Sequence, residues 1–241
     1  GATLTIMDSA APQETVTDFA GTVYGNKATL ENDTLTYYIT TSTPSGTGTK
    51  ETLKQHTVTL TGAIRCDESS DQAIKVNGGT LDIQGGVLRN SNGKRVVQME
   101  GGTMTMSGGY FVGGGVFAQD TTVTISGGYI TNNRENAKCG QDGYGCHGGG
   151  GIATKGGSLT MLGGFVTGNY SEEAGGGMYI GHYNYGNSAT FEMTGGIVAG
   201  NVANKSEGGG IRVSGKTNGS IQASDRVYIT NNKTNTTFDW G

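Results

Sequence analysis

The sequence predicts an all-β protein: a right-handed, single-stranded parallel β-helix, which is a solenoid with three short strands per coil. Three observations lead to this prediction, namely a repeated unit, strict apolar alternation within it, and an unusual composition. Of the 241 residues, 46 are Gly and 2 are Pro, and charged residues make up 15%. Glycine without a three-residue period and nearly without proline excludes collagen. The formal net charge of −4 is lower than disordered chains usually carry.

One unit recurs along the chain and supplies the first strand of each coil. Clear copies occupy residues 79–88, 102–111, 122–130, 158–166 and 190–198, and a degenerate copy occupies 220–229. Apolar residues alternate there with Thr, Ser, Asp or Glu, which is typical of a half-buried strand. The predicted core pairs are Leu81 and Ile83, Met104 and Met106, Val123 and Ile125, Leu159 and Met161, and Phe191 and Met193.

A Gly-Gly pair such as Gly127-Gly128 ends this strand, where a Cβ would clash or φ must be positive. A second strand follows, and a third opens with three glycines, at residues 149–151, 175–177 and 208–210. Stacked coils can bury the apolar stripe that one coil cannot bury alone. One corner of the coils then carries a row of asparagines: Asn133, Asn169, Asn201 and Asn232. Their amides either hydrogen-bond along the stack or simply tolerate turn dihedrals.

The two ends of the chain differ in regularity. Residues 1–55 are expected to be irregular N-terminal coils with a hairpin or loop excursion, part of the same solenoid. Residues 56–241 are expected to form a parallel β-helix of about seven coils. Residues 3–7 and 57–61 both resemble the first strand of the repeat. Turn residues at 42–48 separate two extended runs between them.

Charge and hydropathy exclude several classes of function. Sixteen Lys and Arg against twenty Asp and Glu leave no basic stripe, so we expect no nucleic-acid partner. No apolar run reaches the roughly 18 residues of a membrane span. Residues 210–217 match the phosphate-loop pattern, but the residues between its glycines alternate like a strand, and no helix is expected to follow. We therefore expect no cofactor.

Cys139 and Cys146 bracket the longest insertion of the repeat, residues 134–147. In an exported protein, the glycines between them would allow a disulfide, with Cys66 left as a small buried residue. The competing interpretation is a metal cluster of both cysteines with His147, but a fourth zinc ligand is not evident. The sequence favours the disulfide and no metal.

Stacking would place the variable loops of neighbouring coils side by side at fixed corners. Aromatic rings beside amides and carboxylates suit the faces and hydroxyls of sugars. Solvated polar loops without a ligand are the plainer interpretation. The candidate ligand-binding residues at these corners are Asp142, Tyr144, His147, Glu172, Glu173, His182, Tyr183, Tyr185 and Glu207.

Two segments carry a family resemblance. Gly-Gly-Gly-Ile at 149–152, followed by Val-Thr-Gly-Asn at 166–169, resembles the repeat of bacterial surface β-helix proteins such as the polymorphic membrane proteins. The chain is similar also to glycine- and threonine-rich adhesin-like repeats of gut Firmicutes. The resemblance covers about residues 56–240. It implies an extracellular or cell-surface location and a role in adhesion or glycan contact.

The leading hypothesis is a non-catalytic module that binds a glycan or a host protein through its loop corners, and we expect a monomer. The first alternative is a polysaccharide-degrading enzyme, a lyase or glycoside hydrolase, which would use Asp142, Glu172, Glu173 or Glu207. Against this alternative, the sequence lacks the Asn-Thr-Asp, Asp-Asp and Gly-His-Gly signatures of β-helix enzymes. The second alternative is a structural stalk spacer without a ligand.

Overall fold

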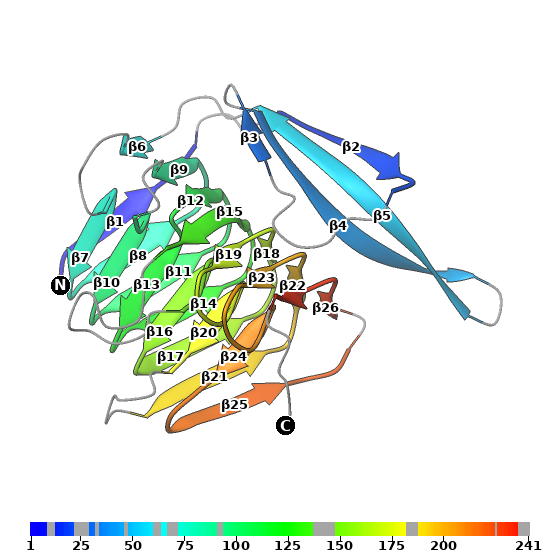
Figure 1. The fold of residues 1–241 in the computed structure, drawn as a ribbon. Helices are drawn as coiled ribbons and strands as arrows, with labels where there is room; N and C mark the ends of the chain where they lie inside the picture. The colour runs from blue at the N-terminus through cyan, green and yellow to red at the C-terminus, as the bar shows by residue number, and fades with distance from the viewer. Residues whose placement is uncertain are drawn as a thin grey trace.

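The computed structural model describes residues 1–8, 13–21, 29–31, 34–45, 48–59, 64–66, 72–90, 94–136, 148–181, 188–224 and 226–235. These ranges contain strands, turns and bends but no helix. Accordingly, the described chain has no long apolar helix that could cross a membrane. The strands form three parallel sheets and one antiparallel sheet (Figure 1). The all-β class and the parallel pairing predicted from the sequence are confirmed.

Along the main path of each parallel sheet, neighbouring strands come from consecutive repeats. The seven-stranded sheet has the order β1 (Thr3–Ile6), β8 (Thr80–Ile83), β11 (Thr103–Met106), β14 (Thr122–Ile125), β17 (Gly157–Met161), β21 (Ala189–Met193) and β25 (Thr217–Ile221). The six-stranded sheet has the order β24 (Ile211–Val213), β20 (Met178–Ile180), β16 (Ile152–Lys155), β13 (Val116–Gln119), β10 (Val97–Glu100) and β7 (Ile74–Asn77).

The third parallel sheet has ten strands. Its main path is β26 (Val227–Thr230), β22 (Gly196–Ala199), β18 (Phe165–Thr167), β15 (Tyr129–Glu135), β12 (Tyr110–Gly113), β9 (Val87–Asn90) and β6 (Ile64–Cys66). A short branch continues from the end of β15 through β19 (Tyr170–Ser171), β23 (Val202–Ala203) and β27 (Lys233–Thr234). From β8 onward the chain visits the seven-, ten- and six-stranded sheets in turn. We call three consecutive main-path strands, one in each sheet, a layer.

The alternating residues of the seven-stranded sheet fill the core. All ten predicted core residues from Leu81 to Met193 are at most 3% exposed and belong to one cluster. Their register is exact across the sheet, with Leu81, Met104 and Val123 opposite one another. The six-stranded and ten-stranded sheets contribute further members, such as Met99 and Phe111. This confirms that period-2 alternation identified the buried face.

The Gly-Gly corners need glycine for two separate reasons. At Gly127 an added Cβ would lie 2.3 Å from the carbonyl oxygen of Ser107 in the preceding repeat, which is a clash with backbone. At Gly128 φ is +83°, a conformation that residues with a Cβ rarely adopt. The pairs at residues 108–109, 163–164 and 195–196 show the same division of roles, whereas at Gly85 the added Cβ would lie 3.1 Å from Asp8. Both reasons expected from the sequence are therefore confirmed.

The corner asparagines form a hydrogen-bonded ladder, which confirms the first of the two interpretations. The Nδ2 of Asn133 donates to Oδ1 of Asn169 at 2.9 Å, and the same oxygen accepts the backbone N–H of Asn133 at 3.0 Å. Asn169 repeats both bonds to Asn201, and Asn201 repeats them to Asn232. The turn dihedral belongs instead to the preceding residues, whose φ is positive: Asn132, Gly168, Gly200 and Asn231.

A four-stranded antiparallel sheet lies between β1 and β6 in the sequence. Its order is β2 (Gln13–Phe19), β5 (Gly48–Thr59), β4 (Thr34–Ser45) and β3 (Thr29–Glu31). The hairpin of β4 and β5 projects away from the parallel sheets (Figure 1). Residues 57–59, whose sequence resembles the first strand of the repeat as residues 3–7 do, pair antiparallel with β2 and β4 instead. The prediction that they form such a strand is wrong, because alternation of apolar and polar residues indicates a half-buried strand but does not determine which strand it pairs with.

The antiparallel sheet covers an aromatic stack on the outer face of the ten-stranded sheet. Tyr110 and Tyr129 have ring centroids 4.8 Å apart, and Tyr129 and Phe165 have centroids 4.5 Å apart, with nearly parallel planes. Tyr37 packs against Tyr129 at 5.4 Å and joins one buried cluster with Leu35 and with this face. Stacked rings of this kind add to the free energy of area burial. The stack thus anchors the antiparallel sheet.

A carboxylate is part of the same contact. The hydroxyl of Tyr37 donates to Oε1 of Glu14 at 2.5 Å, and Nδ1 of His56 lies 2.7 Å from that oxygen. Burial, together with the negative charge of Glu14, raises the pKa of Tyr37 and of Tyr110. These phenols therefore stay protonated over the physiological range.

Candidate functional site

The short branch of the ten-stranded sheet builds a polar corner. Arg134 pairs with Tyr170 in parallel register, and Tyr170 pairs with Val202, so the loops that follow these strands start side by side. Three residues after each ladder asparagine, the chain presents a polar side chain. We call this set the corner row: Asn136, Glu172, Asn204 and Asn235.

Hydrogen bonds connect members of the corner row across neighbouring repeats. Nδ2 of Asn204 donates to Oε1 of Glu172 at 3.2 Å, and Nδ2 of Asn235 donates to Oδ1 of Asn204 at 3.0 Å. Each amide has two N–H donors and two oxygen lone pairs. These bonds use one donor and one acceptor of Asn204, and therefore leave hydrogen-bonding capacity for a ligand.

Glu172 is held as a carboxylate by several partners. The hydroxyl of Tyr170 donates to Oε2 at 2.7 Å, and Nζ of Lys205 lies 3.1 Å from Oε1. The Tyr170 hydrogen bond and the contacts with Lys205 and Asn204 lower the pKa of Glu172 despite partial burial. Correspondingly, the hydrogen bond and charge of Glu172 raise the pKa of Lys205. Glu172 therefore stays ionised near neutral pH.

Tyr170 joins this network to the preceding repeat. The guanidinium of Arg134 lies over its ring, 4.1 Å from the centroid, which is cation–π geometry. Burial and the hydrogen bond to Glu172 raise the pKa of Tyr170 to about 12. Tyr170 is therefore a neutral donor that orients Glu172.

The other two predicted carboxylates in the described chain are also near cations. Glu173 lies 3.6 Å from Lys205, so this lysine bridges Glu172 and Glu173. Glu207 pairs instead with Arg212 at 3.8 Å. The structure thus brings Glu172 and Glu173 together on one lysine, whereas Glu207 pairs with a different cation.

All the other predicted site residues lie outside the described part of the chain. These are the ligand-binding candidates Asp142, Tyr144, His147, His182, Tyr183 and Tyr185, and the disulfide pair Cys139 and Cys146. Their roles stay predictions. Among the described residues, no three His, Cys, Asp or Glu side chains gather as a metal site.

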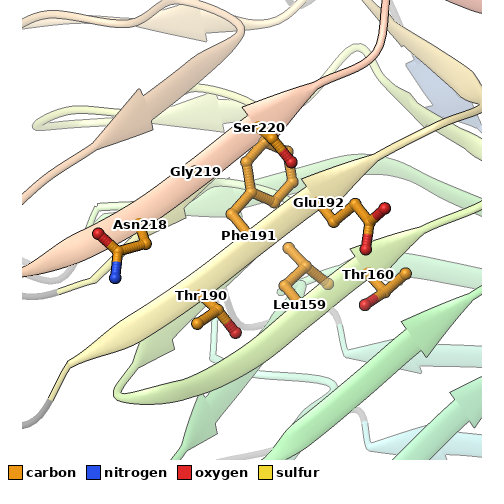
Figure 2. A pocket seen from close by; sticks show the side chains of 8 residues that line it. All are labelled: Leu159, Thr160, Thr190, Phe191, Glu192, Asn218, Gly219 and Ser220. Atoms are coloured by element: carbon orange, nitrogen blue, oxygen red, sulfur yellow. The ribbon is translucent and has the colours of Figure 1, made fainter.

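A second polar feature is a groove of about 290 Å³ on the seven-stranded sheet, lined by β17, β21 and β25. Thr160, Glu192 and Ser220 are register neighbours along it, and Thr190 and Asn218 form a parallel row. Figure 2 shows these side chains spread over three neighbouring strands, with Gly219 between Asn218 and Ser220 on one of them. This volume lies just below the range of ordinary ligand pockets, so the groove has room only for a small ligand.

Sequence reasoning missed Asn204 and Lys205, the residues that engage Glu172 from the next repeat. A signal for them existed, because aligning the repeats on Asn169 and Asn201 places Glu172 opposite Asn204 and Glu173 opposite Lys205. The groove residue Glu192 was also not among the predicted site residues. No protein-family model, curated protein or solved structure is similar enough to the chain to match it.

Proposed function

We propose that the chain is a right-handed parallel β-helix module of an exported bacterial surface protein, and that it binds a glycan without transforming it. Support for the β-helix comes from the strand order, because each repeat from β8 to β24 adds one main-path strand to each of the three parallel sheets. In each sheet the two terminal strands, such as β1 and β25 in the seven-stranded sheet, do not pair with each other in the described chain. This linear order favours a solenoid over a closed barrel. The extracellular location rests on the repeat resemblance.

The corner row carries the binding part of the proposal. Glu172, Asn204 and Asn235 repeat at the strand spacing of a parallel sheet, which is about 4.8 Å. A linear polysaccharide also repeats its hydroxyl groups along one direction. A row of amides and carboxylates, one per repeat, can therefore meet successive hydroxyls with the same geometry.

The electrostatics favour binding over acid–base catalysis. A glycosidase acid needs a raised pKa, so that it is protonated at the working pH. The pKa of Glu172 shifts in the opposite direction, and the single positive charge of Lys205 is shared between Glu172 and Glu173. Such a paired carboxylate suits a fixed acceptor for sugar hydroxyls.

The test is calorimetric binding against a panel of soluble plant, bacterial and host polysaccharides. Lys205→Ala and Asn204→Ala should each weaken binding by about tenfold or more, because each removes a charged or amide contact. The matched control is Lys75→Ala, since Lys75 pairs with Glu100 at 3.0 Å and has the same side-chain exposure, 45% against 46% for Lys205. The control should bind normally.

Other outcomes would replace the proposal. Binding that Asn204→Ala leaves unchanged would reject the corner row. Sugar release that Glu172→Gln abolishes would establish the enzyme alternative instead. A host protein captured in place of any glycan would change the ligand class, and no ligand of either kind would favour the stalk spacer.

A further inference from the structure

The last layer of the parallel sheets leaves the apolar core open at one end. Val213 of β24, Ile221 of β25 and Ile229 of β26 are 46%, 47% and 44% exposed. Their register partners in the preceding layer, Ile180, Met193 and Val198, are all 0% exposed. The three exposed residues are thus core positions that lack a covering layer.

The same end also presents three unpaired strand edges. β24, β25 and β26 are each the terminal main-path strand of their sheet, and no described strand pairs with their outer edges. An exposed edge with apolar side chains is a template for pairing with another strand. Whatever covers this end must therefore offer three parallel strands with apolar residues between them.

The opposite end of the same molecule has the required form. β1, β7 and β6 are the terminal strands of the seven-, six- and ten-stranded sheets there, and Leu4 of β1 is 46% exposed. Since all three sheets are parallel, a second copy in the same orientation would bring β1 to β25, β7 to β24 and β6 to β26. Strand direction would be preserved in every pair.

We propose that copies of this chain associate head to tail, the first strands of one copy stacking on the open end formed by Val213, Ile221 and Ile229 of the other. This departs from the monomer predicted from the sequence, and it does not depend on glycan binding. The contact uses two different surfaces, so it does not close on itself and allows short open chains.

Sedimentation velocity over a wide range of protein concentration tests this proposal. The unmodified chain should associate as its concentration rises. Ile221→Lys and Leu4→Lys should each weaken self-association by more than about tenfold, because each places an unpaired charge in an apolar contact. Leu162→Lys is the matched control, since Leu162 is 48% exposed but lies away from both ends, after β17. The control should associate normally.

Mixing the two end variants gives the sharpest result. Ile221→Lys keeps an intact first end and Leu4→Lys keeps an intact last end, so their mixture has one competent contact and should form a one-to-one dimer. A monomer at every concentration would overturn the proposal, and so would association that survives both substitutions. Association sensitive to Ile221→Lys but not to Leu4→Lys would replace it with contact between two last ends. Unchanged circular dichroism of each variant confirms that the fold is intact.

Discussion

Replacement of Asn169 by alanine tests whether the asparagine ladder stabilises the fold. The substitution removes four hydrogen bonds of one buried amide. The Nδ2 of Asn133 keeps the carbonyl of Phe111, and Oδ1 of Asn201 keeps the backbone N–H of residue 169. The backbone N–H of Asn133, however, loses the acceptor that the ladder gives it.

The magnitude follows from these partners. An unsatisfied buried donor costs about 1–3 kcal/mol, and each net hydrogen bond contributes about 1 kcal/mol. We therefore expect Asn169→Ala to lower the free energy of unfolding by about 3–4 kcal/mol. Asn235→Ala, which removes one exposed hydrogen bond of 3.0 Å to Asn204, should cost less than about 0.5 kcal/mol.

Urea unfolding followed by circular dichroism measures both variants. The midpoint should fall clearly for Asn169→Ala and remain close to the unmodified protein for Asn235→Ala, with similar slopes for all three proteins. If the two variants were equally stable, the ladder would be a geometric coincidence and the reasoning about its hydrogen bonds would fail.

Three further predictions concern charge and backbone. Tyr170→Phe should raise the pKa of Glu172, measured by carbon NMR, because the hydrogen bond from the Tyr170 hydroxyl is the main cause of the lowered pKa. Glu172 stabilises the fold at pH values above its unfolded pKa, and this stabilisation is lost as the pH falls through its folded pKa. The stabilisation should be smaller in the variant. Gly114→Ala should destabilise far more than Gly101→Ala in urea unfolding, since its Cβ would lie 1.4 Å from the Lys94 carbonyl, whereas Gly101 has open space and only a positive φ. Burial raises the pKa of Tyr110 and Tyr129 in the aromatic stack, so in ultraviolet titration they should ionise only above the usual tyrosine pKa of about 10. The fold should lose stability as the pH rises above about 10, because these tyrosines ionise more readily in the unfolded chain. Ionisation of every tyrosine near pH 10 would contradict this prediction.

The sequence predicted the buried face of the seven-stranded sheet because alternation and glycine corners are local signals. It did not predict that a second sheet covers the ten-stranded sheet. A clue was available, since Tyr110-Phe111 and Tyr129-Ile130 place apolar residues consecutively, which indicates a strand buried on both faces. What covers the outer face could not be read locally, because the partner, Leu35, is distant in the sequence.

The candidate site shows the same division. Glu172, Glu173 and Glu207 were found because polar residues at a repeated corner are visible in the sequence. Their pairing was not, because it depends on which side chain of the next repeat reaches each carboxylate, and only the register of β19 with β23 fixes that. A carboxylate viewed alone suggests catalysis, whereas the same carboxylate beside Lys205 suggests a fixed acceptor.

The ladder and the corner row are mechanically linked by their spacing. Each member of the row stands three residues after a ladder asparagine, and the backbone N–H and side chain of Asn169 are both held by Asn201. The ladder therefore sets the separation between Glu172 and Asn204, although it does not contact a ligand. Substitutions in the row should change binding while stability is preserved, whereas substitutions in the ladder should reduce stability and binding together. Calorimetry and urea unfolding on the same variants distinguish these two classes, and a ladder variant that lost stability but kept full affinity would show that the row holds its own spacing.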